Sequence, residues 1–362
     1  MTRFTEWFER LDKAGQFKSG APLGHSGKIL VGRSPVMDGP FVESKEAIAG
    51  FFVIRAASLE QAVEVAEGCP GLEFGQTVEV RAIVAEPCEL QIAREKMTDL
   101  QKNAPHKGKD RYATVNGLKM YYEIHGDGRP LVLLHGGGST IISTFGRILP
   151  ELAKTHRVIA VELQAHGHTP DLDRPLSFEQ DADDVAALLK QLQIEKTDLM
   201  GFSNGGTTSL QIAIRHPELV NRLVLASTTY KRDGMQPGFW EGMQHASLEN
   251  MPKPLKDAYL EANPDPEGLQ AMFDRDVARM LAFKDIGDAD IQAIQAPALV
   301  INGDAEVVRA EHALSLARAL PNSQLAILPG GHGDYIGEIC ASDKRSKIPA
   351  LVTAMIEAFL KG

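Results

Sequence analysis

The chain has 362 residues, of which 43% are hydrophobic and 24% charged, the balance of a globular protein long enough for one large and one small domain. A formal net charge of −10, with no stripe of lysines and arginines, argues against nucleic-acid binding. We expect a cytoplasmic protein with reduced thiols that does not enter a membrane, because it has no apolar run of spanning length, no signal-peptide pattern and only three widely spaced cysteines.

Apolar spacing in the first 85 residues alternates between helical and extended patterns. The predicted order is helix, strand, strand, helix, strand. Asp38 and Gly39 are expected to form a turn, because Asp before Gly is a common turn pair. The predicted elements are a helix at 4–11, strands at 28–32 and 51–54, a helix that starts at the capping-box pair Ser58 and Gln61, and a strand at 77–82.

Residues 1 to about 84 resemble the YCII-related (DGPF) domain family in the segments 38–46 (DGPFVESKE), 58–62 and 78–81. The resemblance implies a small ferredoxin-like α+β domain that usually dimerises, so we expect a structural or dimerising role and a homodimer through this domain. It also implies that the family's proposed chemistry would fall on Asp38, although we favour the turn. The family's first strand has no counterpart here, and we expect the linker or a partner chain to replace it.

A stretch rich in charged residues, 86–111, has no strong hydrophobic face and is interpreted as a linker. From residue 112 onward strands alternate with helices, which predicts a parallel sheet covered on both faces in a domain at 112–362. The alternation of strands and helices is interrupted at about 229–296, where short helical patterns predict a mobile cap. The predicted strands are 119–124, 130–134, 157–163, one ending before Ser203, 223–226, 300–301 and 325–328, and the predicted helices are 177–192 and 207–216.

Residues 201–205, Gly-Phe-Ser-Asn-Gly, are the centre of this region. A sharp strand-to-helix turn needs small neighbours and leaves Ser203 exposed at the top of a sheet, so we predict Ser203 as a nucleophile. The same turn would aim the backbone N–H of Asn204 at the reacting oxygen, as half of an oxyanion hole. A flexible turn is the alternative, because glycine and serine are common in loops.

His135 is followed by three glycines directly after a predicted strand. Backbone N–H groups without side chains can hold an oxyanion, and we choose Gly137 as the second donor, with His135 bracing the loop. A phosphate cradle is the alternative, but the loop lacks the Lys-Ser/Thr ending and the dinucleotide spacing. His166 and His168 are expected to form a turn rather than a metal site, because no carboxylate or cysteine at ligand spacing joins them.

A general base should follow the last strand, and His332 does so among glycines. The acid that orients it must be chosen between Glu306 and Asp304, which both follow the strand ending near residue 301. We favour Glu306 on its position and keep Asp304 as the alternative acid.

Residues 112–362 as a whole resemble the α/β-hydrolase superfamily. The resemblance implies an eight-stranded, mostly parallel sheet with a helical cap, and hydrolysis without a cofactor or metal. Family members usually place an Asp where Glu306 stands, so the loop must absorb one extra methylene. The matching motifs are HGGG at 135–138, GFSNG at 201–205, NGDAE at 302–306 and GH at 331–332.

The leading hypothesis is a serine hydrolase that cleaves a small-molecule carboxylester, lactone or thioester through Ser203, His332, Glu306 and an acyl-enzyme. The alternatives are a non-enzymatic ligand receptor or interaction protein on the same fold, and a cofactorless haloperoxidase or C–C hydrolase. Epoxide and haloalkane hydrolysis are disfavoured, because those reactions need a carboxylate where Ser203 stands.

Overall fold

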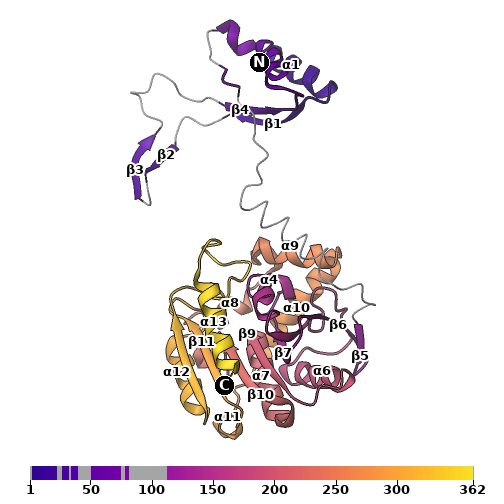
Figure 1. Cartoon of the computed structure of the whole chain (residues 1–362), viewed down its shortest axis with the longest axis vertical. Helices are drawn as coiled ribbons and strands as arrows, with labels where there is room; N and C mark the ends of the chain where they lie inside the picture. The colour runs from indigo at the N-terminus through magenta and orange to yellow at the C-terminus, as the bar shows by residue number, and fades with distance from the viewer. Residues whose placement is uncertain are drawn as a thin grey trace. The chain divides into compact units, whose positions relative to one another are not determined.

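The computed structural model describes residues 2–22, 27–31, 34–39, 50–74, 78–80 and 112–361. The chain divides into two compact units, Met1–His106 and Lys107–Gly362, and each is described by itself (Figure 1). None of the described helices is both long enough and apolar enough to cross a lipid bilayer.

The N-terminal unit combines two helices with two antiparallel strand pairs. Its elements are α1 (Thr2–Lys13), β1 (Phe17–Pro22), β2 (Gly27–Val31), β3 (Ser34–Gly39), β4 (Gly50–Ile54), α2 (Leu59–Glu67) and the 3₁₀-helix η1 (Pro70–Phe74). Strand β1 pairs with β4, and β2 with β3. Helix α1 buries Trp7 and Leu11, one turn apart, in a cluster with Cys69. The Ser58 hydroxyl caps α2 by accepting the Gln61 N–H at 3.2 Å, as predicted.

Both helices and the strands near 28–32 and 51–54 agree with the sequence, but two features of this unit differ. Strand β1 follows α1 directly, although its sequence, Phe-Lys-Ser-Gly-Ala-Pro, lacks the β-branched run that predicts a strand. Asp38 and Gly39 lie within β3, where Asp38 pairs with Lys28, so the predicted turn does not begin there. Cross-strand pairing has overridden a local turn preference.

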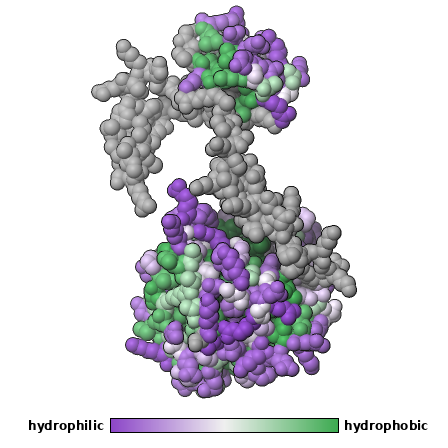
Figure 2. All heavy atoms as spheres, in the orientation of Figure 1, coloured by the Kyte–Doolittle hydropathy of each residue, from purple (hydrophilic) through white to green (hydrophobic). Residues whose placement is uncertain are grey.

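The predicted strand at 77–82 is described only at residues 78–80, which are not in a strand. The rest of that segment, residues 40–46 of the DGPF motif and the predicted linker at 86–111 lie outside the described residues. Figure 2 shows apolar surface on the visible face of the N-terminal unit. The exposed large apolar side chains recorded in this unit are Leu59, Val63, Leu72 and Phe74.

The second unit is built on an eight-stranded sheet in the order β12-β11-β10-β9-β7-β8-β6-β5. Only β6 runs against the direction of the other strands, in its pairings with β5 and β8, so the predicted mostly parallel sheet is confirmed. Its strands are β5 (Tyr112–Val115), β6 (Leu118–His125), β7 (Arg129–Leu134), β8 (His156–Val161), β9 (Thr197–Phe202), β10 (Val220–Ala226), β11 (Ala298–Gly303) and β12 (Ser323–Leu328).

Helices cover both faces of this sheet, which explains why its central strands are apolar throughout. On β7, Val132 and Leu134 face the helices α6, α7, α11 and α12, whereas Leu131 and Leu133 face α4, α5 and α13. These helices are α4 (Ile141–Phe145), α5 (Leu149–Leu152), α6 (Phe178–Gln191), α7 (Asn204–Arg215), α11 (Asp288–Ala293), α12 (Ala310–Ala319) and α13 (Ile348–Lys361).

The cap consists of α8 (Phe239–Gln244), α9 (Lys253–Ala262) and α10 (Pro266–Ala282). A small apolar cluster that includes Met251, Tyr259 and Met272 holds α9 and α10 together. In Figure 1, α9 and α10 lie at the upper end of this unit and α11 at the lower end. Helix α11 packs on α7 and α12, so the last part of the predicted cap at 229–296 belongs to the sheet core instead.

Candidate active site

Ser203 lies at the sharp turn between β9 and α7. Its backbone has φ 54° and ψ −120°, a strained conformation for a residue with a side chain, and its N–H donates to Ala226 O at 2.8 Å. A Cβ on Gly205 would collide with the Leu134 carbonyl group, and one on Gly201 with the backbone of Gly205. The turn needs both glycines, as predicted, and leaves Ser203 half-buried.

The loop after β7 is braced by His135. Its Nδ1 donates to Gly136 O at 2.8 Å and its Nε2 accepts the Leu163 N–H at 3.1 Å, so the ring is neutral with its proton on Nδ1. Burial, helped by the positive charge of His166, lowers the pKa of His135 to about 3, in agreement with that state. Because the N–H and C=O of a trans peptide point in opposite directions, the bond to Gly136 O also sets the direction of the Gly137 N–H.

Gly137 lies directly against Asn204. A Cβ on Gly137 would be 2.5 Å from Asn204 Nδ2, so a larger residue there would displace the Asn204 side chain. Asn204 is the first residue of α7, and its backbone N–H is one of the groups at a helix N-terminus that have no partner within the helix. The two residues selected from the sequence as oxyanion donors are therefore neighbours, at the positive end of a helix.

His332 follows β12, and its ring packs on Phe202, the residue before Ser203, with ring centroids 4.7 Å apart. Its Nδ1 lies 2.9 Å from Oε2 and 3.1 Å from Oε1 of Glu306. The Glu306 side chain is 1% exposed and that of His332 33% exposed. Because a carboxylate can only accept, Nδ1 carries the proton of the neutral ring, and Nε2 keeps its lone pair.

A buried hydroxyl and a backbone N–H hold Glu306 in place. Ser227 Oγ donates to Oε1, and the Val307 N–H donates to Oε2 at 3.0 Å. Since the single Ser227 proton goes to the carboxylate, the Tyr335 hydroxyl donates to Ser227 Oγ at 2.5 Å. Burial, and then the charge of Glu306, raises the pKa of Tyr335 well above its ordinary value, which keeps the phenol protonated. Sequence reasoning missed Ser227 and Tyr335 because neither lies in a motif.

Asp304, the alternative acid, is exposed and faces elsewhere. Its Oδ1 accepts the Gly330 N–H at 2.9 Å, and its own N–H donates to Leu328 O at 2.8 Å. Asp304 therefore joins the loop after β11 to the loop that carries His332. The carboxylate beside the His332 ring is that of Glu306.

His166 and His168 form the predicted turn but face different partners. His166 Nε2 lies 3.0 Å from Asp276 Oδ2 in a buried site, and His168 Nδ1 lies 2.9 Å from Glu162 Oε2 while its ring stacks on Tyr121. Within the described ranges, no three His, Cys, Asp or Glu side chains are grouped as a metal site would require. Sequence reasoning missed Asp276, because no spacing rule connects a cap helix with a turn about 110 residues earlier.

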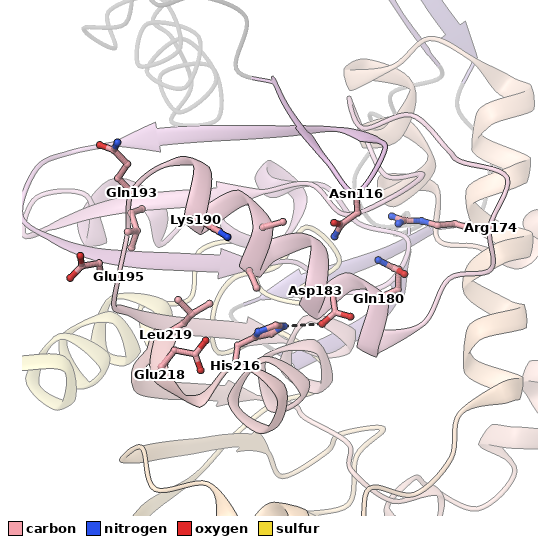
Figure 3. Close-up of a pocket in the computed structure, with 13 residues that line it drawn as sticks. Asn116, Arg174, Gln180, Asp183, Lys190, Gln193, Glu195, His216, Glu218 and Leu219 are labelled. Atoms are coloured by element: carbon pink, nitrogen blue, oxygen red, sulfur yellow. Dashed lines mark hydrogen bonds and ion pairs between the residues drawn. The ribbon is translucent and has the colours of Figure 1, made fainter.

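A groove of about 1320 Å³ lies along α6 and the end of α7 (Figure 3). Within it, Asp183 accepts from Arg215 at 2.7 Å and from His216 at 2.8 Å, so these charges neutralise one another. Neither Ser203 nor His332 lines this groove, and its lining residues include no serine or cysteine nucleophile. We therefore do not assign the chemistry to it.

Comparisons with known proteins match both units. The family described as alpha/beta hydrolase fold matches residues 129–274, and the YCII-related domain matches residues 1–86. Human Serine hydrolase BPHL is 30% identical over 233 residues, which cover 60% of this chain and 77% of the human protein. A 2-hydroxymuconate semialdehyde hydrolase from a Pseudomonas species is 30% identical over 251 residues, which cover 62% of this chain and 87% of that protein.

Solved structures show the same fold. A meta-cleavage product hydrolase from Pseudomonas fluorescens has a TM-score of 0.59 at 23% identity, covering 70% of this chain and 97% of that one. The enol-lactonase from Burkholderia xenovorans has a TM-score of 0.54 at 24% identity, covering 69% of this chain and 100% of that one. The fold class and both resemblances inferred from the sequence are confirmed.

Proposed function

The chain belongs to the α/β-hydrolase family and carries a YCII-related domain at residues 1–86, and from this premise we propose that it is a serine hydrolase that cleaves a carboxylic ester, lactone or thioester. The human and Pseudomonas relatives described above bear hydrolase names, which favours an enzyme over a ligand receptor. The observation that carries the proposal is the buried carboxylate of Glu306, 2.9 Å from His332 Nδ1 on a ring that packs beside the Ser203 turn.

In the proposed reaction His332 is the general base. With its Nδ1 proton donated to Glu306, its Nε2 takes the proton of Ser203 Oγ as that oxygen attacks the substrate carbonyl. Glu306 stays ionised and stabilises the imidazolium that forms. His332 then gives the proton to the leaving group, and the same ring activates the water that hydrolyses the acyl-enzyme.

The negative oxygen of the tetrahedral intermediate would be held by the N–H groups of Gly137 and Asn204. Backbone donors fixed before the reaction need no reorganisation when charge develops, and losing one such donor typically lowers kcat by about 10²- to 10³-fold. The bond from His135 to Gly136 O supports Gly137 as a donor, because it presets the direction of that N–H.

Turnover of p-nitrophenyl esters of increasing acyl length tests the proposal on the full chain. We expect hydrolysis by the wild-type protein, covalent labelling by a fluorophosphonate, and loss of both in Ser203→Ala, because no other group then serves as nucleophile. A label that maps to another residue, or that persists in Ser203→Ala, would contradict the assignment.

Hydrolysis of a carbon–carbon bond is a second candidate, favoured by the relative named 2-hydroxymuconate semialdehyde hydrolase. A substrate of that kind carries a carboxylate, which calls for a positive charge near the nucleophile. The buried cap arginine, Arg279, is already paired with Asp181 and Asp276, and this supports a neutral acyl substrate instead. Parallel assays with 2-hydroxymuconate semialdehyde and p-nitrophenyl acetate would decide between the two.

For the N-terminal unit we propose a role in dimerisation. Phe74 is 72% exposed and Leu59 50% exposed, which offers apolar surface for a contact with a second copy. Light scattering of the full chain should give a dimer mass that falls in Phe74→Glu. The matched control is Leu351→Glu in the other unit, where the leucine is 70% exposed. An unchanged mass in Phe74→Glu, or a monomeric wild-type protein, would contradict this role.

A further inference from the structure

A carboxylate on the cap helix α10 reaches the loop that carries Gly137. Asp276 Oδ2 accepts the Gly138 N–H at 2.6 Å and lies 3.0 Å from His166 Nε2, while Oδ1 accepts from Arg279 on the same helix. Arg279 also donates to Asp181 of α6 at 2.7 Å. Four charged side chains that are almost fully buried therefore meet where the cap contacts the sheet.

Hydrogen-bond partners fix the charge of His166. Its Nδ1 lies 2.8 Å from the Gln164 carbonyl oxygen and its Nε2 faces the Asp276 carboxylate. Both of these partners can only accept, and the Gly138 N–H, 3.3 Å from Nε2, donates to the nearer Asp276 Oδ2 at 2.6 Å, so both ring nitrogens carry protons and the ring is an imidazolium. Burial alone would lower the pKa of His166, but the Asp276 carboxylate raises it overall. Burial likewise opposes ionisation of Asp276, yet Arg279 and His166 together hold the pKa of that carboxyl well below its usual range.

The contact with Asp276 fixes one peptide plane of the loop. Gly138 has φ +65°, and the peptide that joins it to Gly137 is bound at both ends: its N–H by Asp276 and its C=O by Ser139 Oγ at 3.3 Å. The preceding peptide, which bears the Gly137 N–H, is held by His135. The two planes share the Gly137 Cα, so neither can turn freely while both are bound.

We infer that Asp276 is a positioning residue for acyl transfer, which sets the Gly137 N–H through its hold on Gly138 and so completes the oxyanion hole only when α10 is seated on the sheet. This inference rests on the proposed function. Asp276 acts through the loop and does not contact the reacting atoms. A carboxylate suits the role because it accepts from Gly138, His166 and Arg279 at once, and an amide in its place has only one accepting oxygen.

The test compares Asp276→Asn with Asp274→Asn, an exposed aspartate on the same helix. Each kcat is measured with p-nitrophenyl acetate and divided by the fraction of sites that a fluorophosphonate titrates, so that misfolded protein does not count. We expect kcat per titrated site to fall about tenfold or more in Asp276→Asn, with KM within about twofold, because a misdirected donor weakens transition-state binding. Asp274→Asn should match the wild-type protein.

An unchanged kcat per titrated site in folded Asp276→Asn, with only a lowered Tm, would overturn the inference. If Asp276→Asn does not fold, His166→Gln tests the same contact, because it removes the positive charge that pairs with Asp276. A kcat per titrated site about threefold lower or more then supports the inference, and an unchanged value overturns it. Failure of the proposed function looks different, because the wild-type protein itself would then neither turn over the ester nor be labelled at Ser203.

Discussion

Two histidines in this molecule lie beside buried carboxylates, yet their surroundings differ. His332 is bonded to Glu306 through Nδ1 alone and is one-third exposed, with 33% of its side chain accessible. His166 is fully buried, and both of its ring nitrogens face acceptors, Gln164 O and Asp276 Oδ2. The first ring can exchange a proton at Nε2, whereas the second is locked as a cation. A histidine–carboxylate pair can act as a base only where one ring nitrogen stays open.

Replacing the two histidines gives the largest expected contrast. His332→Gln removes the base and should lower kcat by about 10⁴-fold or more, whereas His166→Gln should lower it by about threefold to tenfold. Stopped-flow assays with p-nitrophenyl acetate would measure both. Equal losses of kcat in the two variants would contradict the view that only His332 acts as a base.

The two candidate acids that follow β11 sharpen the same comparison. Glu306→Gln should lower kcat by about 10³- to 10⁴-fold, because an amide no longer fixes the tautomer and orientation of the imidazole. Asp304→Asn is the control and should stay within about threefold of the wild-type kcat, since this exposed residue serves only a loop contact. A large loss in Asp304→Asn with little change in Glu306→Gln would reverse the assignment of the acid.

Ser227→Ala tests how Glu306 is held. Glu306 and Tyr335 would each lose a buried hydrogen-bond partner, so we expect a free energy of unfolding about 1–3 kcal/mol lower. The kcat should fall about tenfold, because His332 is then oriented by a looser carboxylate. Urea unfolding and ester turnover would measure the two effects, and Ser227→Thr, which keeps the hydroxyl, should retain more of both than Ser227→Ala. A kcat equal to that of wild type would show that Glu306 needs no such support.

The charge of His166 should also affect how the free energy of unfolding depends on pH. Because the pKa of His166 is raised by folding, its charge stabilises the folded state fully below its ordinary value near 6.5, and the gain is lost as pH rises through the folded pKa. The difference in unfolding free energy between wild type and His166→Gln should therefore shrink between pH 6.5 and pH 9. Asp276, Arg279, Asp181 and His135 face this ring, and Asp181, whose pKa burial raises to about 6, completes most of its ionisation by pH 7. A constant difference would mean that the ring is not charged when folded.

The sequence revealed the parts of the site that lie in short local patterns. Residues 201–205 and the glycines after His135 could be recognised because strained turns and crowded backbone demand glycine. Position, not residue type, pointed to Glu306 over Asp304. The hydrophobic rhythm of β7 to β12 likewise predicted the sheet, since apolar runs between helical patterns indicate parallel strands.

The rest depends on contacts between distant segments. Asp276 reaches Gly138 across 138 positions, and Ser227 reaches Tyr335 across 108. A single chain gives no sign of such pairs, because aspartate and serine occur widely on surfaces and in turns. In the N-terminal unit, β1 was missed for a related reason: its partner β4, and not its own composition, makes it a strand.

The ion pairs of α10 also distinguish it from the other two cap helices, because they tie it to residues outside the cap. Lifting α10 would leave His166 and Asp181 charged in an apolar surrounding, at a cost of several kcal/mol. The ion pair that the described residues record for α8 and α9 joins Lys253 to Asp257 within α9 itself. Substrate and product are therefore expected to pass without displacement of α10, which serves as the fixed base of the cap and on which α8 and α9 pack through apolar clusters.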